Sequence, residues 1–179
     1  MGQRQDFEFV STLADQFFRS PHIKKSFHTI DEAGLTGWEK WLQIEFAIYL
    51  ESQDSIAGWK REAHYHLDGR VAAGKKKCSV DFVIKQKWKW SHLALEVKQI
   101  KSADRCVDHM VKDKARIAAI RGTQFDIRSV WSLGVHQFVD SDEAKRLAHY
   151  YADSYGVAFD PRLISSHKIA KTNYAYTIF

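Results

Sequence analysis

Two strand patterns and the turn between them are contained in residues 78–99, CSVDFVIKQKWKWSHLALEVKQ. In each half, apolar residues recur at every second position, which is the period of a strand that is buried on one face. We therefore expect strands at 78–84 and 92–99, joined by a polar loop that is rich in lysine. The alternation also predicts that Glu96 and Lys98 point the same way, about 6–7 Å apart along their strand.

On both sides of this stretch, the chain changes between helical and strand periodicity. Spacings of three and four residues predict helices at 6–19, 36–52, 103–121 and 141–156, and period-two runs predict further strands at 62–67, 129–135 and 174–179. Thr36 and Glu39 fit a capping box, Ser141 fits an N-cap, and residues 20–34 are expected to be a polar connection. This order predicts a mixed α/β (α+β) fold with helices on the faces of one mixed sheet.

Length and composition limit the class of protein. The 179 residues carry a net charge of +5 and fit one domain, 1–179. Two cysteines, Cys78 and Cys106, are too few for a disulfide framework, so we expect a reducing, cytoplasmic environment. No apolar run approaches the ~18 residues of a membrane span, and no membrane partner is expected. We find no Ser-His-Asp arrangement, glycine-rich phosphate loop or zinc-knuckle spacing.

The two strands of residues 78–99 bring three reactive side chains together. If they pair, Asp81 meets Glu96 and Lys98, and two carboxylates on a rigid sheet suit Mg²⁺ or Mn²⁺. Such a cation polarises a phosphate oxygen and lowers the pKa of a bound water, which the lysine can orient or deprotonate. Glu45 falls on the buried stripe of helix 36–52 and is expected to add a third carboxylate. The alternative is a solvent-facing strand pair with Glu45 at the rim of its helix.

These residues resemble the motif of the PD-(D/E)XK nuclease superfamily, which has the restriction-endonuclease-like fold. The resemblance covers about residues 36–135, with Val80 in the position of the motif's proline. It implies an α-β-β-β-α-β core, Asp81 and Glu96 as metal ligands, Lys98 as the catalytic lysine and Glu45 as the auxiliary carboxylate. The implied activity is that of a DNA endonuclease, with a homodimer or a partner protein supplying specificity. The alternative is a catalytically silent nuclease-fold domain that binds DNA or a protein as a regulator or inhibitor.

Basic residues are concentrated around the same two strands. Between Lys75 and Lys101 there are eight lysines and only two acidic residues, Asp81 and Glu96. Lysine contacts to phosphate give salt-sensitive affinity for nucleic acid, and exposed tryptophans stack on bases. The predicted nucleic-acid contacts are Lys75, Lys76, Lys77, Lys85, Lys87, Trp88, Lys89, Trp90 and Lys101. The alternative is a solvated hairpin whose lysines protect an edge strand.

One lysine falls in an unusual place. Lys114 shares the apolar face of helix 103–121 with Met110, Val111, Ile117 and Ala118. The ordinary interpretation is a lysine whose alkyl chain lies on apolar surface while its ammonium group stays in water.

Overall fold

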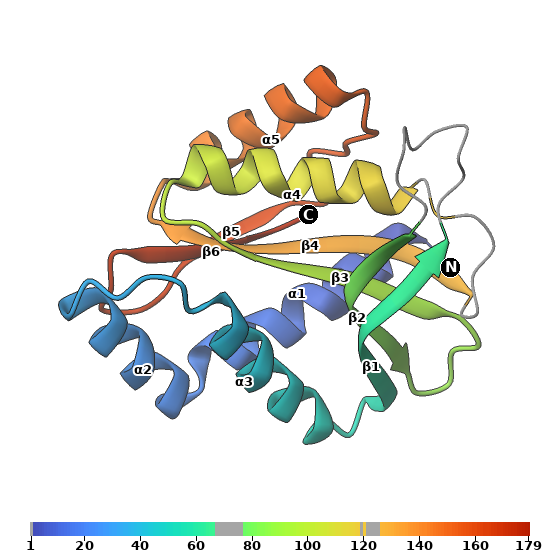
Figure 1. The fold of residues 1–179 in the computed structure, drawn as a ribbon, viewed down its shortest axis with the longest axis horizontal. Helices are drawn as coiled ribbons and strands as arrows, with labels where there is room; N and C mark the ends of the chain where they lie inside the picture. The colour runs from blue at the N-terminus through green and yellow to red at the C-terminus, as the bar shows by residue number, and fades with distance from the viewer. Residues whose placement is uncertain (1, 67–76, 119, 121–125) are drawn as a thin grey trace.

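The computed structural model describes residues 2–66, 77–118, 120 and 126–179. Figure 1 shows a mixed α/β fold, which confirms the predicted class. The helices are α1 (Gln3–Arg19), α2 (Pro21–Glu32), α3 (Glu39–Glu51), α4 (Ala103–Ala118) and α5 (Ser141–Tyr155). The strands are β1 (Ile56–His66), β2 (Lys77–Gln86), β3 (His92–Gln99), β4 (Ile127–Gln137), β5 (Ser165–Lys168) and β6 (Tyr174–Ile178). From α3 to β4 the order is α-β-β-β-α-β, as predicted.

The strands form one six-stranded sheet in the order β1-β2-β3-β4-β6-β5. Among the described strands, β3 and β4 form the one parallel pair, and α4 connects them. Helices α1, α2 and α3 cover one face of the sheet and α4 and α5 the other (Figure 1). Leu95 and Val97 of β3 are buried in the core beneath α1 to α3, whereas Ala94 packs with Ile117 of α4. Alternation in β3 therefore directs Glu96 and Lys98 to the α4 face.

Helix α2 corrects the expectation of a polar connection between residues 20 and 34. Its buried residues are Ile23, Phe27 and Ile30, a sparse stripe at helical spacing, and Pro21 occupies its first turn. Phe27 packs edge-on against Trp38, with ring centroids 5.1 Å apart. Packing on the core therefore stabilises a helix whose remaining positions are mostly polar.

Three further expectations about element ends were wrong. Helix α3 begins after Trp38 and has no side-chain cap, so Thr36 and Glu39 do not form a capping box. Helix α5 is capped by Asp140, whose carboxylate accepts a hydrogen bond from the Glu143 amide at 2.8 Å, so Ser141 is not the N-cap. At the C-terminal end there are two strands rather than one, because β5 pairs with β6.

Close packing of α4 on the sheet depends on a glycine. A Cβ atom on Gly134 of β4 would overlap the sulfur of Met110 and lie 2.9 Å from that of Cys106. Cys78 and Cys106 are both free. Within the described ranges, none of the helices combines the length and apolar character needed to cross a membrane.

Candidate active site

The candidate site lies where β2 and β3 stop pairing. Their register sets Ile84 opposite Leu93 and Phe82 opposite Leu95. Continuing this register by one residue would place Asp81 opposite Glu96. Instead, the Asp81 carboxylate (Oδ2) accepts a hydrogen bond from the Val97 backbone amide at 2.9 Å. A side chain thus takes the place of a strand partner, and the sheet opens at the predicted residues.

A second carboxylate satisfies the next amide along the same edge of β3. The Glu39 carboxylate (Oε2) accepts a hydrogen bond from the Gln99 amide at 2.8 Å. Alternate amides of a strand point to the same edge, so Val97 and Gln99 face the same opening. Helix α3 brings its first residue to this opening, where Asp81 arrives from β2.

Glu96 is the most deeply buried acid of the site, with 4% of its surface exposed. Burial raises its pKa to about 9, assisted by the nearby carboxyl groups of Asp81 and Asp113 and opposed by Arg116. One of its oxygens (Oε1) is buried without a hydrogen-bond partner, and the other lies 3.8 Å from the Arg116 guanidinium. Glu96 therefore holds a proton at neutral pH in the site as it stands.

Lys98 is paired with an acid from α4. Its ammonium group lies 2.9 Å from the Asp113 carboxylate, which also lies 3.1 Å from Arg116. Burial acts to lower the pKa of Lys98, but the carboxylates of Asp113, Glu39 and Asp81 outweigh it and the pKa is raised. Lys98 is thus a stable cation that donates hydrogen bonds, and in this state it is not a base.

Glu45 is not part of this arrangement. Its carboxylate lies 3.3 Å from the His22 ring (Nε2) of α2, on the opposite face of the sheet from α4. Glu39 and Glu45 are six residues apart, which places them about 120° apart around a helix of 3.6 residues per turn. Helix α3 therefore brings Glu39, and not the predicted Glu45, to the opening beside β3.

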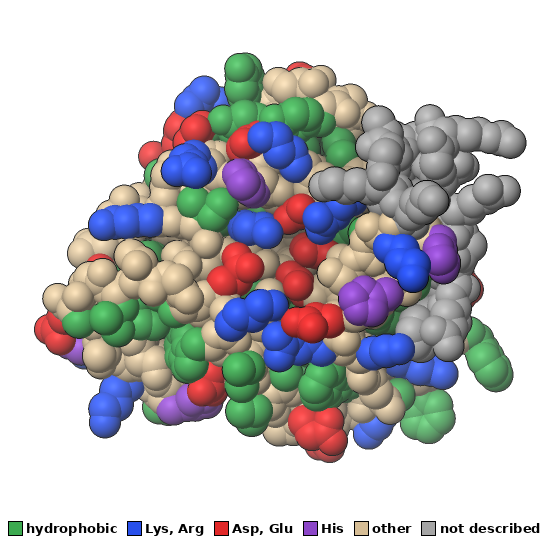
Figure 2. Space-filling view, in the orientation of Figure 1, with side chains coloured by type: hydrophobic (Ala, Val, Ile, Leu, Met, Phe, Trp, Pro, Cys, Tyr) green, Lys and Arg blue, Asp and Glu red, His purple; other side chains and the backbone are tan. Residues whose placement is uncertain are grey.

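Asp113 was missed by the sequence analysis, and Arg116 lies beside it on α4. They lie on the α4 surface that meets the ends of Glu96 and Lys98. Their spacing of three residues is that of a helical ion pair, and that spacing was the only available signal. In Figure 2, acidic and basic side chains are interleaved at the middle of the face viewed. The site is therefore a network of opposite charges rather than a cluster of acids.

The donor set suits a divalent cation in part. In the portion of the chain that the structure describes, no three His, Cys, Asp or Glu side chains are grouped as a metal site would require. Two carboxylates are enough for Mg²⁺, which keeps several waters. The Glu96 carboxyl group interacts with Asp81, and its unpartnered oxygen is an acceptor that either a proton or a cation would satisfy. The residues present thus fit a divalent cation only in part: Asp81 and Glu96 would be its two carboxylate ligands.

The described basic residues of this region lie at both ends of β2 and β3. Lys75 and Lys76 lie outside the described residues. Lys85, Lys87 and Lys89 surround the β2–β3 turn, whereas Lys77 begins β2 and Lys101 follows β3 at the other end. The eight residue-to-residue rises of extended strand from Lys77 to Lys85 span about 26 Å. Trp88 and Trp90 at the turn are 97% and 95% exposed. Lys85, Lys87, Trp88, Lys89 and Trp90 are thus gathered at the β2–β3 turn, while Lys77 and Lys101 lie away from it.

Comparisons with known proteins found no family model and no curated protein that matches this chain. The fold and the local chemistry of the site are accordingly the basis for a functional proposal.

Proposed function

We propose that the protein is a divalent-metal-dependent DNA endonuclease of the PD-(D/E)XK type. The observation that carries the proposal is the convergence of Asp81, Glu96 and Lys98 at the opening between β2 and β3. Three side chains predicted from strand periodicity are neighbours on one face of the sheet. The α-β-β-β-α-β order of elements around them is the one that the resemblance implies.

Each residue has a distinct task in this proposal. Asp81 and Glu96 would hold Mg²⁺ or Mn²⁺, and Glu96 loses its proton when it does so. The cation, when bound, supplies Lewis acidity toward a phosphate oxygen and a lowered pKa for a bound water. Lys98 remains an ammonium group and donates hydrogen bonds to the attacking water or the phosphate. Asp113 is a positioning residue, since it fixes the Lys98 side chain from α4.

Substrate binding would use the lysines and tryptophans at the two ends of β2 and β3. Lys85, Lys87 and Lys89 near the turn suit contacts to the phosphate backbone. The two exposed tryptophans, Trp88 and Trp90, suit stacking on bases. We also propose a cytoplasmic location, because both cysteines are free.

The test is cleavage of supercoiled plasmid DNA by the purified protein with Mg²⁺, Mn²⁺ or EDTA. The informative variant is Asp81→Asn, since an amide oxygen still accepts the Val97 hydrogen bond while the charge is lost. The matched control is Glu143→Gln, because Glu143 and Lys145 repeat the Glu-x-Lys spacing on the exposed surface of α5. We expect Asp81→Asn to lose at least about 100-fold in rate, and the control to keep the wild-type rate.

Cleavage that persists in EDTA, or that is equal in wild type and Asp81→Asn, would refute the proposal. An EDTA-sensitive cleavage activity that both Asp81→Asn and the Glu143→Gln control lose would also count against the proposal. The loss in Asp81→Asn could then not be attributed to the candidate site. Asp113→Asn supplies a further readout. If Asp113 acts only through Lys98, this variant lowers kcat with little change in metal affinity.

One observation favours the silent nuclease-fold domain as a second candidate. Asp113 pairs with Lys98, and the Arg116 guanidinium lies 3.8 Å from Glu96. The protein's own side chains therefore already supply opposite charges to the residues that would act on a metal or a substrate. A domain of this kind would bind DNA or a protein partner without turnover. Binding unaffected by EDTA and by Asp81→Asn, with no cleavage under either metal, would establish this candidate in place of the first.

A further inference from the structure

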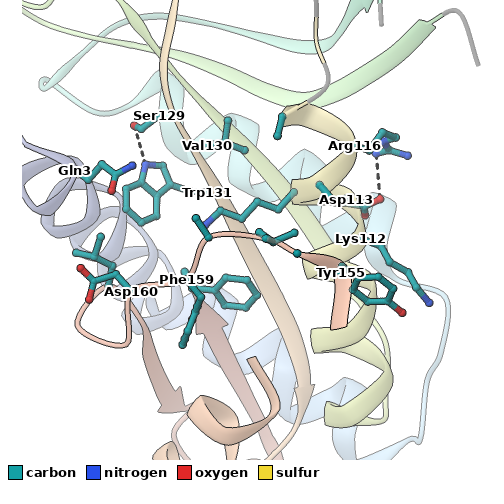
Figure 3. A pocket seen from close by; sticks show the side chains of 18 of the residues that line it. Gln3, Lys112, Asp113, Arg116, Ser129, Val130, Trp131, Tyr155, Phe159 and Asp160 are labelled. Atoms are coloured by element: carbon teal, nitrogen blue, oxygen red, sulfur yellow. Dashed lines mark hydrogen bonds and ion pairs between the residues drawn. The ribbon is translucent and has the colours of Figure 1, made fainter. Parts of the chain in front are cut away.

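A cavity of about 1070 Å³ lies between α4, β4 and the segment that follows α5. Figure 3 shows Trp131 and Phe159 facing the same space from β4 and from this segment. Leu163 and Phe179 complete an apolar wall contributed by distant parts of the chain. Cavities of this size and lining hold small organic molecules.

The apolar wall receives one amine. Lys114 of α4 lines the cavity, with its Nζ atom 5.6 Å from the centre of the Trp131 ring and 5.4 Å from that of Phe179. No acid in the described portion of the chain forms an ion pair with it. Burial lowers the pKa of Lys114 to about 8. The Lys114 side chain is partly exposed, and its amine lies beside two aromatic rings rather than beside an acid.

The other charged groups around the cavity already have partners. Lys112 pairs with Asp108 at 2.7 Å and Asp113 with Arg116 at 3.1 Å, both on α4. From the other elements, Arg128 of β4 pairs with Asp6 at 3.0 Å, Asp160 pairs with Arg162 at 2.8 Å, and the Tyr155 hydroxyl donates to Asp108 at 2.7 Å. Among the described lining residues, Lys114 therefore carries the one charge that no opposite charge balances.

We propose that this cavity is a binding site for an organic anion with an aromatic or other apolar body. The anionic group, a carboxylate, sulfonate or phosphate, would lie on the Lys114 ammonium group, and the body would pack against Trp131 and Phe159. An anion at this position supplies the counter-charge that the protein does not. A hydrogen bond between an ammonium group and an anion is stronger than one between neutral groups. The cavity borders the candidate active site at Asp113 and Arg116, but Lys114, Trp131 and Phe159 are not part of that site, and anion binding does not depend on the proposed nuclease activity.

The experiment compares two fluorescent probes of similar shape. The first, 1-anilinonaphthalene-8-sulfonate, carries a sulfonate, and the second, N-phenyl-1-naphthylamine, is its neutral counterpart. Wild type, Lys114→Met and Lys112→Met are titrated with each probe. Lys112→Met is the matched control, because Lys112 also lines the cavity but pairs with Asp108. Circular dichroism and thermal unfolding verify that each variant is folded.

We expect one saturable site for the sulfonate in wild type and about a tenfold or greater loss of affinity in Lys114→Met. The neutral probe and the Lys112→Met control should change little. In wild type the sulfonate affinity should fall as the pH rises beyond about 8, since the amine loses its proton. Equal sulfonate affinity in wild type and Lys114→Met, an equal loss in both variants, or no saturable binding to wild type would overturn the proposal.

Discussion

Replacing Lys114 with methionine should stabilise the protein at neutral pH. Methionine has nearly the same length and shape and carries no charge into the cavity. The pKa of Lys114 falls from 10.5 to about 8 on folding, because burial penalises the ammonium form. A difference of this size corresponds to roughly 3 kcal/mol of unfavourable free energy at pH 7. Attraction to the Trp131 and Phe179 rings offsets about 1 kcal/mol of it, which leaves an expected gain of about 2 kcal/mol.

The dependence of this gain on pH follows from the direction of the shift. Below pH 8 the amine is charged in both the folded and the unfolded state, so wild type bears the full cost of burying the charge. Between pH 8 and 10.5 the folded state releases its proton while the unfolded chain keeps it, and wild type gains stability. The gap between Lys114→Met and wild type should therefore narrow as the pH approaches 10.5.

The assay is urea unfolding monitored by circular dichroism at pH 7, 8.5 and 10, with Lys112→Met as the control. At pH 7, Lys114→Met should also melt several degrees above wild type, on the order of 4–8 °C for a domain of this size. Lys112→Met should remain close to wild type, because Lys112 is exposed. A Lys114→Met variant that is less stable than wild type at pH 7, with a gap that is constant in pH, would refute the reasoning.

Three further changes test other parts of the molecule. In EDTA, the stability of wild type should decrease relative to that of Glu96→Gln as the pH rises from about 4.5 towards 9, because folding raises the pKa of Glu96 and the folded state keeps a proton that the unfolded chain releases. Urea titrations with parallel pH profiles for the two proteins would contradict this expectation. Gly134→Ala should cost about 1–3 kcal/mol, since its Cβ would overlap Met110, and an unchanged melting temperature would contradict the packing described. Replacing Trp88 and Trp90 with alanine should leave the melting temperature unchanged and weaken binding of a labelled single-stranded oligonucleotide about tenfold or more. Anisotropy titrations showing full affinity would remove the tryptophans from the proposed interface.

Strand periodicity was the most informative part of the sequence. Strand β3 has the predicted bounds, and β2 is longer than predicted by one residue at its start and two at its end. The alternation in β3 arises although both of its faces are buried, because the large residues Leu93, Leu95 and Val97 lie in the larger core, whereas Ala94 packs with Ile117 of α4. In contrast, β5 was missed, since Ser165–Lys168 contains no apolar residue and its pairing with β6 is decided by the rest of the sheet.

Local periodicity predicted the residues that the two strands contribute to the candidate site, but not those that the helices contribute. Asp81, Glu96 and Lys98 follow from alternation within two neighbouring strands. The contribution of α3 depends on how that helix is rotated against the sheet, and a stripe of buried residues does not show which end of the helix approaches β3. For the same reason Asp113 and Arg116 could not be assigned: their contacts exist only after α4 has packed on the β3–β4 pair.

The opening between β2 and β3 also provides a local reporter of the site. The Val97 and Gln99 amides are held by the carboxylates of Asp81 and Glu39 rather than by a neighbouring strand. Their hydrogen-exchange rates therefore depend on two side chains, whereas the exchange of amides within the β2–β3 ladder depends on the opening of the sheet. A ligand that draws Asp81 away from Val97 would accelerate exchange at that amide and leave the ladder unchanged. Exchange at these two positions would thus distinguish a rearranged site from a loosened fold.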